Sequence, residues 1–445
     1  MSTLQTNRKI NLLQATSINM IDMVGIGPFV VMPFVVAQFS SGLFIWAWIF
    51  GAFTAFMDAM TWSELGAKYP LAGGTYNFHR IAFGAKGGKL MSFLFVWQTS
   101  IQAPLVVASA SIGFAHYLSY FGHLGFIQEK IVSGGLVILV FILLYRKIES
   151  IGKISVIMGS IVVLTIIWII VSGLWNQQQP VKFLPTGGES FFTYAFWAAV
   201  GQASVKTVYA YLGYYNVCHL GGEIKNPGIN IPKSIFISIF GITTLYLLMN
   251  ISVMSVMPWE SINKDNKYLV SSFMEQLYGH QAGVLVTILI LCIAFSSLFA
   301  VVLGYSRVPY AAAVDNNFFS PFAKLHPTKN FPYISLIVLC ATGFIFSLLF
   351  KLADVISSIL AMRIMIQFIG QAVGVVLLRK KFGTEGLPFK MLLYPLPIII
   401  SIAIWLFLFI STGWFALWGS LIALAGAIIY FIKDKVTAEM QGRGG

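Results

Sequence analysis

The sequence predicts an all-α integral membrane protein with about twelve transmembrane helices. Apolar types make up 58% of the 445 residues, charged types only 10%, and the mean hydropathy is +0.83. A soluble fold carries about a quarter charged residues, so a soluble enzyme, a disulfide scaffold and a disordered chain are excluded. The apolar residues also gather in runs long enough to cross a bilayer as helices, without the alternation of a strand.

Twelve apolar runs define the expected helices. Lipid offers no partner for free backbone N–H and C=O groups, so each run is expected to be helical. The fourth run is the weakest, because Glu129 and Lys130 interrupt its start. In chain order the runs are Leu12–Gln38, Gly42–Gly66, Gly88–Leu118, Ile127–Tyr145, Ile154–Trp175, Phe191–Leu220, Ser234–Met257, Ala282–Ala313, Tyr333–Phe350, Val355–Leu378, Met391–Ile410 and Trp414–Ile432.

The placement of Lys and Arg predicts the orientation of these helices. With the N-terminus inside, the inner loops and tails hold 21 of the 28 basic residues, and the outer loops hold only Lys130, Lys182, Lys264, Lys267 and Lys351. Basic residues collect in cytoplasmic loops, so both termini are expected in the cytoplasm of a multi-pass protein of the plasma or inner membrane. The net charge of +13 is therefore interpreted as a topological signal and not as a nucleic-acid site.

Two expected helices carry helix-breaking residues near their middles. The first contains Gly25-Ile26-Gly27-Pro28 and the sixth contains Tyr209-Ala210-Tyr211-Leu212-Gly213. Broken helix at membrane depth is tolerated where it lines a cavity or is buried in protein. The breaks lie five spans apart, so the two helices run in opposite directions, as in an inverted repeat of five plus five. Exposed N–H groups attract anions and carbonyls attract cations, which suits a zwitterion; the alternative is that these residues only permit close packing.

Four ionisable residues lie well within expected spans, where such groups usually mark a pathway. Asp22 precedes Gly25 by about one turn and could contact an amine of the substrate, or it could hydrogen-bond the unwound backbone. Lys206 lies on the outer side of the second break, from where it could reach the outer vestibule. Asp58 and Arg363 are interpreted as structural, with partners that the sequence does not identify.

Three further charges, Glu64, Glu223 and Arg307, lie at the inner ends of spans. They are interpreted as an inner gate, with helix capping and loop salt bridges as the alternative. No zinc-binding pair, phosphate-cradling loop or nucleophile elbow is present, and the histidines and cysteines lack metal spacing. The sequence therefore predicts neither an enzyme nor a cofactor, and solute gradients are expected to supply the driving force.

Several motifs resemble those of the amino acid–polyamine–organocation superfamily, nearest its L-type amino acid transporter branch. The resemblance covers roughly Met20 to Lys390, and its motifs are Trp62-Ser63-Glu64-Leu65-Gly66-Ala67-Lys68-Tyr69-Pro70, Ala72-Gly73-Gly74-Thr75-Tyr76, Gly222-Glu223-Ile224-Lys225-Asn226-Pro227, Ile231-Pro232-Lys233, Ser306-Arg307, Tyr310-Ala311, Asp315 and Phe322-Ala323-Lys324-Leu325-His326-Pro327.

This resemblance implies a leucine-transporter-like fold of ten core and two peripheral helices, with alternating access around a midplane site. The implied segments are a cytoplasmic tail (1–11), a first five-helix repeat (12–175), a second, inverted repeat (191–380), two peripheral helices (390–432) and a cytoplasmic tail (433–445).

The resemblance also assigns roles at the two breaks. Gly25, Ile26 and Gly27 would hold the substrate carboxylate, and the carbonyls of Tyr209, Ala210 and Tyr211 would hold the amine, with Gly213 completing the second break. Tyr209 would be an aromatic gate. Many relatives carry a lysine in the fifth span that stands in for a sodium ion, and Val162 occupies that position here. Exchange, uniport and protonation elsewhere therefore stay open.

The favoured function is a secondary active transporter or exchanger of amino acids. The alternative is transport of polyamines or other organic cations. Asp22 favours it, and so does the anion site, which has one donor fewer because Pro28 has no N–H. A channel or a membrane-embedded enzyme is a remote third. The expected partners are a small amino acid or amine and the lipid bilayer, with no nucleic acid, and the oligomeric state stays open.

Overall fold

The computed structural model describes residues 8–39, 42–71, 73–145, 151–181, 183–185, 190–262, 264–329 and 331–442. Parts of both expected tails (1–7 and 443–445), Ala72 of the second motif, Arg146 and Lys147 of an expected inner loop, and Lys182 of an outer loop lie outside these residues. Within them every regular element is helical, apart from a single bridge between Ile10 and Ile224.

The prediction of an all-helical membrane protein is confirmed. Over the described ranges, eight helical stretches are long and apolar enough to span a membrane, and nine if the bent pair α1–α2 counts as one span. The helices are α1 (Leu12–Val24), α2 (Gly27–Val36), α3 (Ile45–Lys68), α4 (Thr75–Ala82), α5 (Gly84–Leu118), α6 (Phe126–Leu144), α7 (Ile151–Trp175), α8 (Tyr194–Tyr211), α9 (Asn216–His219), α10 (Pro227–Val256), α11 (Leu269–Tyr278), α12 (His280–Tyr305), α13 (Arg307–Val314), α14 (Tyr333–Leu349), α15 (Leu352–Arg363), the π-helix η5 (Ile364–Ile369), α16 (Gly370–Phe382), α17 (Leu396–Ser411) and α18 (Trp414–Gly442).

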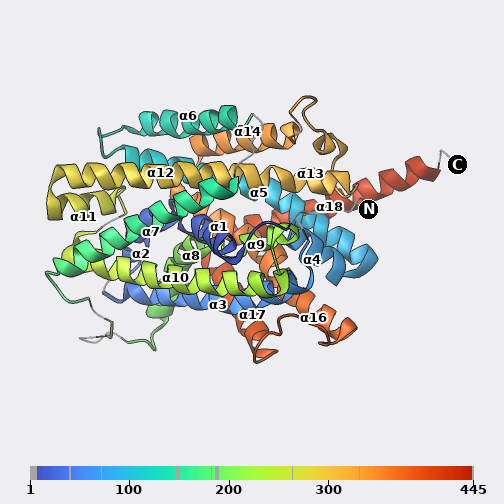
Figure 1. Cartoon of the computed structure of the whole chain (residues 1–445), viewed down its shortest axis with the longest axis horizontal. Helices are drawn as coiled ribbons and strands as arrows, with labels where there is room; N and C mark the ends of the chain where they lie inside the picture. Colours follow the sequence, from blue (N-terminus) through green and yellow to red (C-terminus); the bar gives the residue numbers. More distant parts are fainter. Residues whose placement is uncertain are drawn as a thin grey trace.

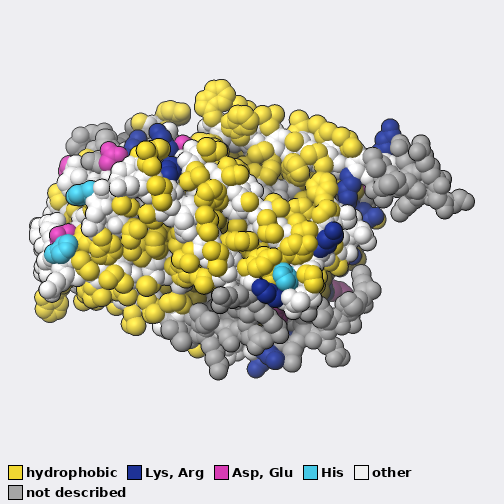
Figure 2. Space-filling model, turned by 90° about the horizontal axis from the view of Figure 1, so that it is seen from above, with side chains coloured by type: hydrophobic (Ala, Val, Ile, Leu, Met, Phe, Trp, Pro, Cys, Tyr) yellow, Lys and Arg dark blue, Asp and Glu magenta, His cyan; other side chains and the backbone are white. Residues whose placement is uncertain are grey.

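Most long helices run along the longest axis of the molecule (Figure 1). In that view α1 and α9 lie at the centre, α6 and α14 lie together along one edge, and α3 and α17 lie along the opposite edge. Apolar side chains cover the middle of the face in Figure 2, and Lys and Arg side chains gather toward the end from which α18 projects. A broad apolar belt of this kind is what a lipid-facing surface requires.

The first expected span is divided between α1 and α2, which are bent by 44° with Gly25 and Ile26 between them. A capping box starts α1: the Asn11 side chain accepts from the Gln14 N–H at 2.9 Å, and the Gln14 side chain accepts from the Asn11 N–H at 3.1 Å. Pro28 lies in the first turn of α2, where its missing N–H costs no hydrogen bond. Local sequence therefore favours the start of each of the two helices that meet at the bend.

In the sixth span the chain leaves the helix later than the sequence suggested. Tyr209, Ala210 and Tyr211 form the last turn of α8, and the irregular segment runs from Leu212 to Tyr215 before the single turn of α9. Gly213 has a φ of +119°, which an L side chain rarely adopts. The positive-φ turn of this segment therefore lies at its glycine, Gly213.

Three elements were not expected from the sequence. Helix α4 fills what looked like a loop, α11 lies between the seventh and eighth spans, and η5 interrupts the tenth span. The π-helix η5 joins α15 to α16 without ending the span. Such π segments frequently occur at functional sites.

Candidate functional site

A cavity of about 60 Å³ lies where the α1–α2 break meets the end of α8. Helices α5, α12 and α15 close its other sides. Its lining comprises Asp22, Met23, Gly25, Ile26, Gly27, Val106, Ala110, Tyr209, Leu212, Gly213, Tyr215, Ser297, Val301, Tyr305, Ile359 and Arg363. Both interrupted segments, far apart in sequence, therefore border one space.

The two interrupted segments touch through their backbones. A Cβ built on Gly213 would lie 2.8 Å from the carbonyl carbon of Asp22 and from the amide nitrogen of Met23. A Cβ on Gly25 would lie 2.7 Å from the Ser297 hydroxyl. At Gly213 the neighbouring atoms are backbone and cannot move aside, so glycine is required there; at Gly25 the neighbour is a serine hydroxyl, which would have to rotate away.

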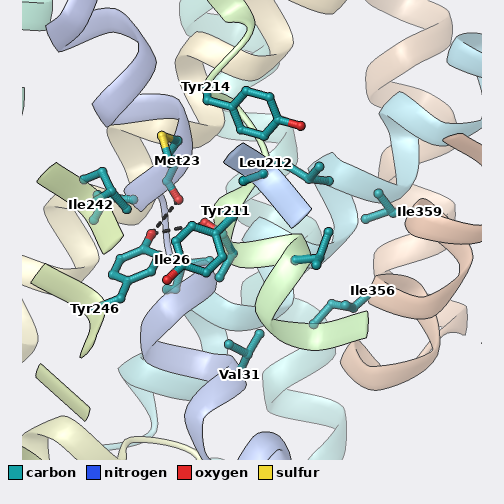
Figure 3. Close-up of a cluster of buried hydrophobic side chains, with 14 of the residues drawn as sticks. Met23, Ile26, Val31, Tyr211, Leu212, Tyr214, Ile242, Tyr246, Ile356 and Ile359 are labelled. Atoms are coloured by element: carbon teal, nitrogen blue, oxygen red, sulfur yellow. Dashed lines mark hydrogen bonds between the residues drawn. The ribbon is translucent and has the colours of Figure 1, made fainter. Parts of the chain in front are cut away.

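Tyr246 of α10 bonds to both segments. Its hydroxyl lies 2.9 Å from the Met23 carbonyl oxygen and 3.2 Å from the Ala210 carbonyl oxygen, and the side chain is fully buried. Figure 3 shows these two bonds beside the ring of Tyr211 and the side chain of Ile26. The single hydroxyl proton of Tyr246 is thus shared between two carbonyls that the helix ends leave free, with the Met23 oxygen the nearer acceptor.

Arg363 is the charged group that the sequence analysis did not place at the site. It is 3% exposed, and its guanidinium donates to the hydroxyls of Tyr215 and Tyr305. No carboxylate of the described residues forms an ion pair with it, although Asp22 lines the same cavity and interacts with it electrostatically. The sequence left the partners of Arg363 unidentified, and the structure places this side chain in the cavity lining with Tyr215 and Tyr305 as its partners.

The predicted gate residue Tyr209 lines the cavity. Its hydroxyl lies 2.8 Å from the Ser109 hydroxyl of α5. A Cβ on Gly27 would come within 3.4 Å of the Tyr209 ring, so the ring lies against the first turn of α2. Tyr209 therefore bridges from α8 to both α2 and α5 at the edge of the cavity.

Several other predicted residues lie away from the cavity lining. The Tyr211 ring packs edge-on against Trp48 at 6.2 Å, and the Ala210 carbonyl is bonded to Tyr246. Lys206 donates to the Ala353 carbonyl at 3.0 Å and to the Ser357 hydroxyl at 2.6 Å. Lys206 therefore links α8 to the first turns of α15.

Asp58 is fully buried among hydrogen-bond donors and not beside Arg363. Its carboxylate accepts from Tyr214 at 2.6 Å, from the Trp62 indole at 2.8 Å and from the Trp405 indole at 3.3 Å. These donors come from three different segments, which Asp58 holds together. The structure thus supplies the partners that the sequence did not identify.

The predicted inner gate is arranged differently from the expectation. Glu64 accepts two bonds from Arg379 of α16, at 2.7 and 2.5 Å, and a third from the Met391 N–H at 2.8 Å. Arg307 donates to the Leu303 carbonyl at 2.6 Å, and Glu223 is exposed. No direct ion pair joins Glu64, Glu223 and Arg307 in the described part of the chain. Arg379 is the partner that sequence reasoning missed.

The segment before α1 is tied to the segment after α9. The Ile10 N–H donates to the Glu223 carbonyl at 3.0 Å, and the Lys225 N–H donates to the Ile10 carbonyl at 2.9 Å. Deeper in the molecule, the Asn19 side chain accepts from the Val217 N–H at 2.9 Å. These bonds hold α1 and α9 together on one side of the cavity.

Nothing in the described ranges brings together three or more His, Cys, Asp or Glu side chains that could hold a metal ion. What the cavity offers instead is hydrogen bonding and charge. Free N–H groups at the start of α2, the carboxylate of Asp22, the guanidinium of Arg363 and four hydroxyls border it. Such a set can bind a small polar solute in one orientation.

Comparison with known proteins adds a family and several relatives. A family model described as "Amino acid permease" matches residues 10–432. A serine/threonine exchanger of Bacillus subtilis (strain 168) is 26% identical over 97% of this chain and 98% of its own. A branched-chain amino acid permease of the same organism is 23% identical over 98% and 94%. A cystine/glutamate transporter of Homo sapiens is 26% identical over 89% of this chain and 79% of its own.

Proposed function

This chain belongs to the amino acid permease family, and on that premise we propose that it exchanges amino acids at the cavity between the α1–α2 break and the end of α8. It is an amino acid transporter and not an enzyme. The relatives include a protein named a serine/threonine exchanger and one named a cystine/glutamate transporter. Exchange is therefore the mode that we assign.

One observation carries this assignment: donors for a carboxylate and acceptors for an amine border the same cavity. Over the described residues, neither the Ile26 N–H nor the Gly27 N–H has a backbone acceptor, and both lie at the positive end of α2. The Asp22 carboxylate forms no hydrogen bond with a described residue. A zwitterion placed between them would pair its carboxylate with α2 and its amine with Asp22.

The amine would be held chiefly by Asp22, with the Tyr209 carbonyl, which already accepts from the Leu212 N–H at 3.3 Å, as a second acceptor through its other lone pair. Because Tyr246 already occupies the Ala210 carbonyl, that oxygen is a weaker ligand than the family resemblance implied. Tyr211 acts on the site only through its packing. Tyr209 would close the cavity over the bound substrate, and Lys206 would couple α8 to α15 as they move.

Arg363 and its two tyrosines would recognise the substrate side chain. The guanidinium cannot be deprotonated at physiological pH and presents several donors. An oxygen-bearing side chain would add a further charge-assisted hydrogen bond to those that Arg363 already makes with Tyr215 and Tyr305, whereas an aliphatic side chain would add none. We therefore assign small polar or acidic amino acids as the substrates.

The same residue argues against the alternative of polyamine transport. A polycation would bring positive charge next to a buried arginine that no described carboxylate neutralises by direct pairing, which is unfavourable in a low-dielectric site. Asp22 by itself favours a cation. Polyamine transport and amino acid transport therefore differ in which residue, Asp22 or Arg363, decides the charge of the substrate side chain, and we propose that Arg363 decides it.

We further propose the leucine-transporter-like arrangement of twelve spans. The longer helices supply up to nine candidate spans, and helix α8 with the shorter apolar helices α14 and α17 would bring the number to twelve. In this arrangement residues 12–175 and 191–380 form inverted five-helix repeats, and 390–432 form two peripheral helices. Both termini would be cytoplasmic, in keeping with the Lys and Arg distribution.

Alternating access would then use the contacts on either side of the cavity. Glu64 with Arg379 would hold α3 against α16 on the inner side, and Arg307 and Glu223 would approach each other there without direct pairing. Release of these contacts would accompany opening to the cytoplasm. Tyr209 would control access from the other direction.

The test is counterflow in liposomes that contain the purified protein. Vesicles are preloaded with unlabelled serine, glutamate, leucine or spermidine and then receive trace labelled serine. We expect serine or glutamate inside to drive uptake, and leucine and spermidine to drive little. Uptake driven by spermidine alone would contradict the proposal, and so would the absence of counterflow with every amino acid.

A further inference from the structure

Asp58 of α3 is a carboxylate within a candidate span, and its hydrogen-bond partners in the described chain are all neutral donors. These donors are the Tyr214 hydroxyl and the indoles of Trp62 and Trp405. No Lys, Arg or His of the described residues forms an ion pair with this buried side chain. Indole nitrogens only donate, so both tryptophans depend on an acceptor here. An ionisable group inside a span is costly and usually serves a function, and the rings of its donors lead to the cavity.

The first connection runs from Asp58 through Trp62 to the cavity. The Trp62 indole lies flat on the Tyr215 ring, with centroids 4.3 Å apart and planes inclined by 14°. Tyr215 lines the cavity, and its hydroxyl accepts from the Arg363 guanidinium. The bond from Tyr214 to Asp58 also fixes the residue directly before Tyr215. Asp58 therefore orients, through two donors, the ring whose hydroxyl holds Arg363.

The second connection runs from Asp58 through α17 to the span that carries Arg363. The Trp405 indole of α17 stacks on the Phe368 ring of η5, with centroids 4.0 Å apart and planes inclined by 2°. The π-helix η5 follows Arg363 directly in the chain, and the Phe368 ring meets the Tyr215 ring edge-on at 6.1 Å. The two connections therefore meet at Tyr215 and form a closed ring of packed side chains that begins and ends at Asp58.

We propose that Asp58 is a positioning residue for Arg363 and so takes part in substrate selection, although it does not line the cavity. The inference rests on the proposed function, in which Arg363 recognises the substrate side chain. Helix α17 contributes none of the described residues that line the cavity, yet its indole donor belongs to this arrangement. Asp58 acts through an aromatic cluster, which comprises Trp62, Tyr214, Tyr215, Phe368 and Trp405.

The guanidinium of Arg363 is held from two sides, and only one of them belongs to the aromatic cluster. Tyr305 of α12 accepts from it outside the cluster, and Tyr215 accepts from it within the cluster. If Asp58 no longer orients Tyr215, the guanidinium stays buried and bonded to Tyr305 but loses its fixed direction. A planar guanidinium matches an oxygen-bearing group only in a defined orientation. Loss of the carboxylate should therefore reduce the preference for polar side chains and leave exchange itself in place.

The test is selectivity in counterflow. Unlabelled serine and unlabelled leucine compete against labelled serine in liposomes, and the ratio of their half-inhibitory concentrations does not depend on the amount of folded protein. Asp58→Asn offers one acceptor oxygen in place of two, and we expect the ratio to move about fivefold toward leucine, the effect of about one hydrogen bond. Trp405→Phe keeps an aromatic ring without the donor and should move the ratio in the same direction. Trp418→Phe, at a tryptophan of α18 that is 61% exposed, should leave it unchanged.

A double variant shows whether Asp58 acts through Arg363. Residues that act through one another have non-additive effects. In protein that already carries Arg363→Lys, Asp58→Asn should therefore add no further change in the ratio. A full additional change would overturn the inference, because Asp58 would then act on selectivity by another route.

The outcomes separate this inference from the proposed function. An unchanged ratio in both Asp58→Asn and Trp405→Phe would overturn the inference and leave exchange intact, and so would a lower total rate with an unchanged ratio, since that is a structural effect alone. Tyr214→Phe removes one hydroxyl from Asp58 and gives the same readout if Asp58→Asn does not fold. The absence in the wild type of counterflow, or of any preference for serine over leucine, would overturn the proposed function instead.

Discussion

The hydroxyl of Tyr246 donates to the main-chain carbonyl of Met23 across 2.9 Å, at the point where α1 ends. The same hydroxyl lies 3.2 Å from the Ala210 carbonyl in the last turn of α8. One side chain of α10 therefore holds both interrupted segments in the positions that form the cavity. The geometry of the site depends on a residue that does not line it.

Removing this hydroxyl should loosen the site without unfolding the protein. A buried hydrogen bond contributes about 1 kcal/mol net, so Tyr246→Phe should lower transport efficiency about five- to tenfold. The measurement is the initial rate of serine counterflow against serine concentration. Tyr194→Phe, at a tyrosine that is 89% exposed, is the matched control. A Tyr246→Phe variant with wild-type kinetics would show that Tyr246 does not position the breaks.

The guanidinium of Arg363 should decide side-chain selectivity. Arg363→Lys keeps the charge but cannot donate to Tyr215 and Tyr305 in the same fork geometry. We expect it to weaken serine and glutamate about tenfold or more, since a lost charge-assisted hydrogen bond costs about 1.5–3 kcal/mol. Competition of unlabelled amino acids against labelled serine measures this. Equal competition by leucine and serine in the wild type would contradict the assigned role.

The turn at Gly213 should not accept a side chain. Its φ of +119° and the 2.8 Å approach to the Asp22 backbone both exclude a Cβ. Gly213→Ala should therefore abolish counterflow or greatly reduce the yield of folded protein. Gly135→Ala, at a helical glycine with nothing within 4 Å of its Cβ position, should have little effect. Equal behaviour of the two variants would mean that the chain reroutes around Gly213.

The Glu64–Arg379 pair should contribute more to stability than the exposed pair Arg80–Asp315. The Glu64 and Arg379 side chains are only 4% and 11% exposed, against 41% and 43% for Asp315 and Arg80. Removing one partner of a buried pair costs about 3–5 kcal/mol, whereas an exposed pair contributes about 0–1 kcal/mol. Thermal unfolding in detergent should show a large fall for Glu64→Gln and little change for Asp315→Asn. Equal shifts would contradict this ranking.

His79 should make the protein less stable in acid. Burial lowers the pKa of His79 to about 4, whereas an unfolded chain has a pKa of about 6.5. Between these values the unfolded state binds more protons, so stability falls as the pH is lowered from about 6.5 to 4. His79→Gln should flatten this slope in thermal unfolding measured across that range, and His123→Gln, at an exposed histidine, should not. An unchanged slope in His79→Gln would contradict the prediction.

Much of the fold and part of the site follow from local sequence. Composition and run length predict a helical membrane protein because lipid leaves the backbone no other choice. The Gly-Pro segment at residues 25–28 predicts the bend between α1 and α2, since those residues disfavour a continuous helix. The Tyr209 position at the cavity follows from the family resemblance.

The remaining contacts depend on helix rotation and on partners distant in sequence. The sequence marks Arg363 as a buried charge, but its approach to Tyr305 and Tyr215 is set by how the end of α15 lies against the end of α12 and the segment between α8 and α9. Arg379, the partner of Glu64, lies 315 residues away. The π-helix η5 has no Gly or Pro within Ile364–Ile369 to signal it. These features arise from tertiary packing, which single-sequence patterns do not encode.

The most direct test of the central claim is substrate protection of a single cysteine in the cavity. Ser297 lines the cavity, so Ser297→Cys is made in a chain whose Cys218, Cys292 and Cys340 are replaced by alanine. The rate of modification by a small water-soluble thiol reagent is then measured with and without amino acid. The account predicts that serine slows modification and that spermidine does not. An unchanged rate with every amino acid, in a protein that still performs counterflow, would contradict the placement of the substrate in this cavity.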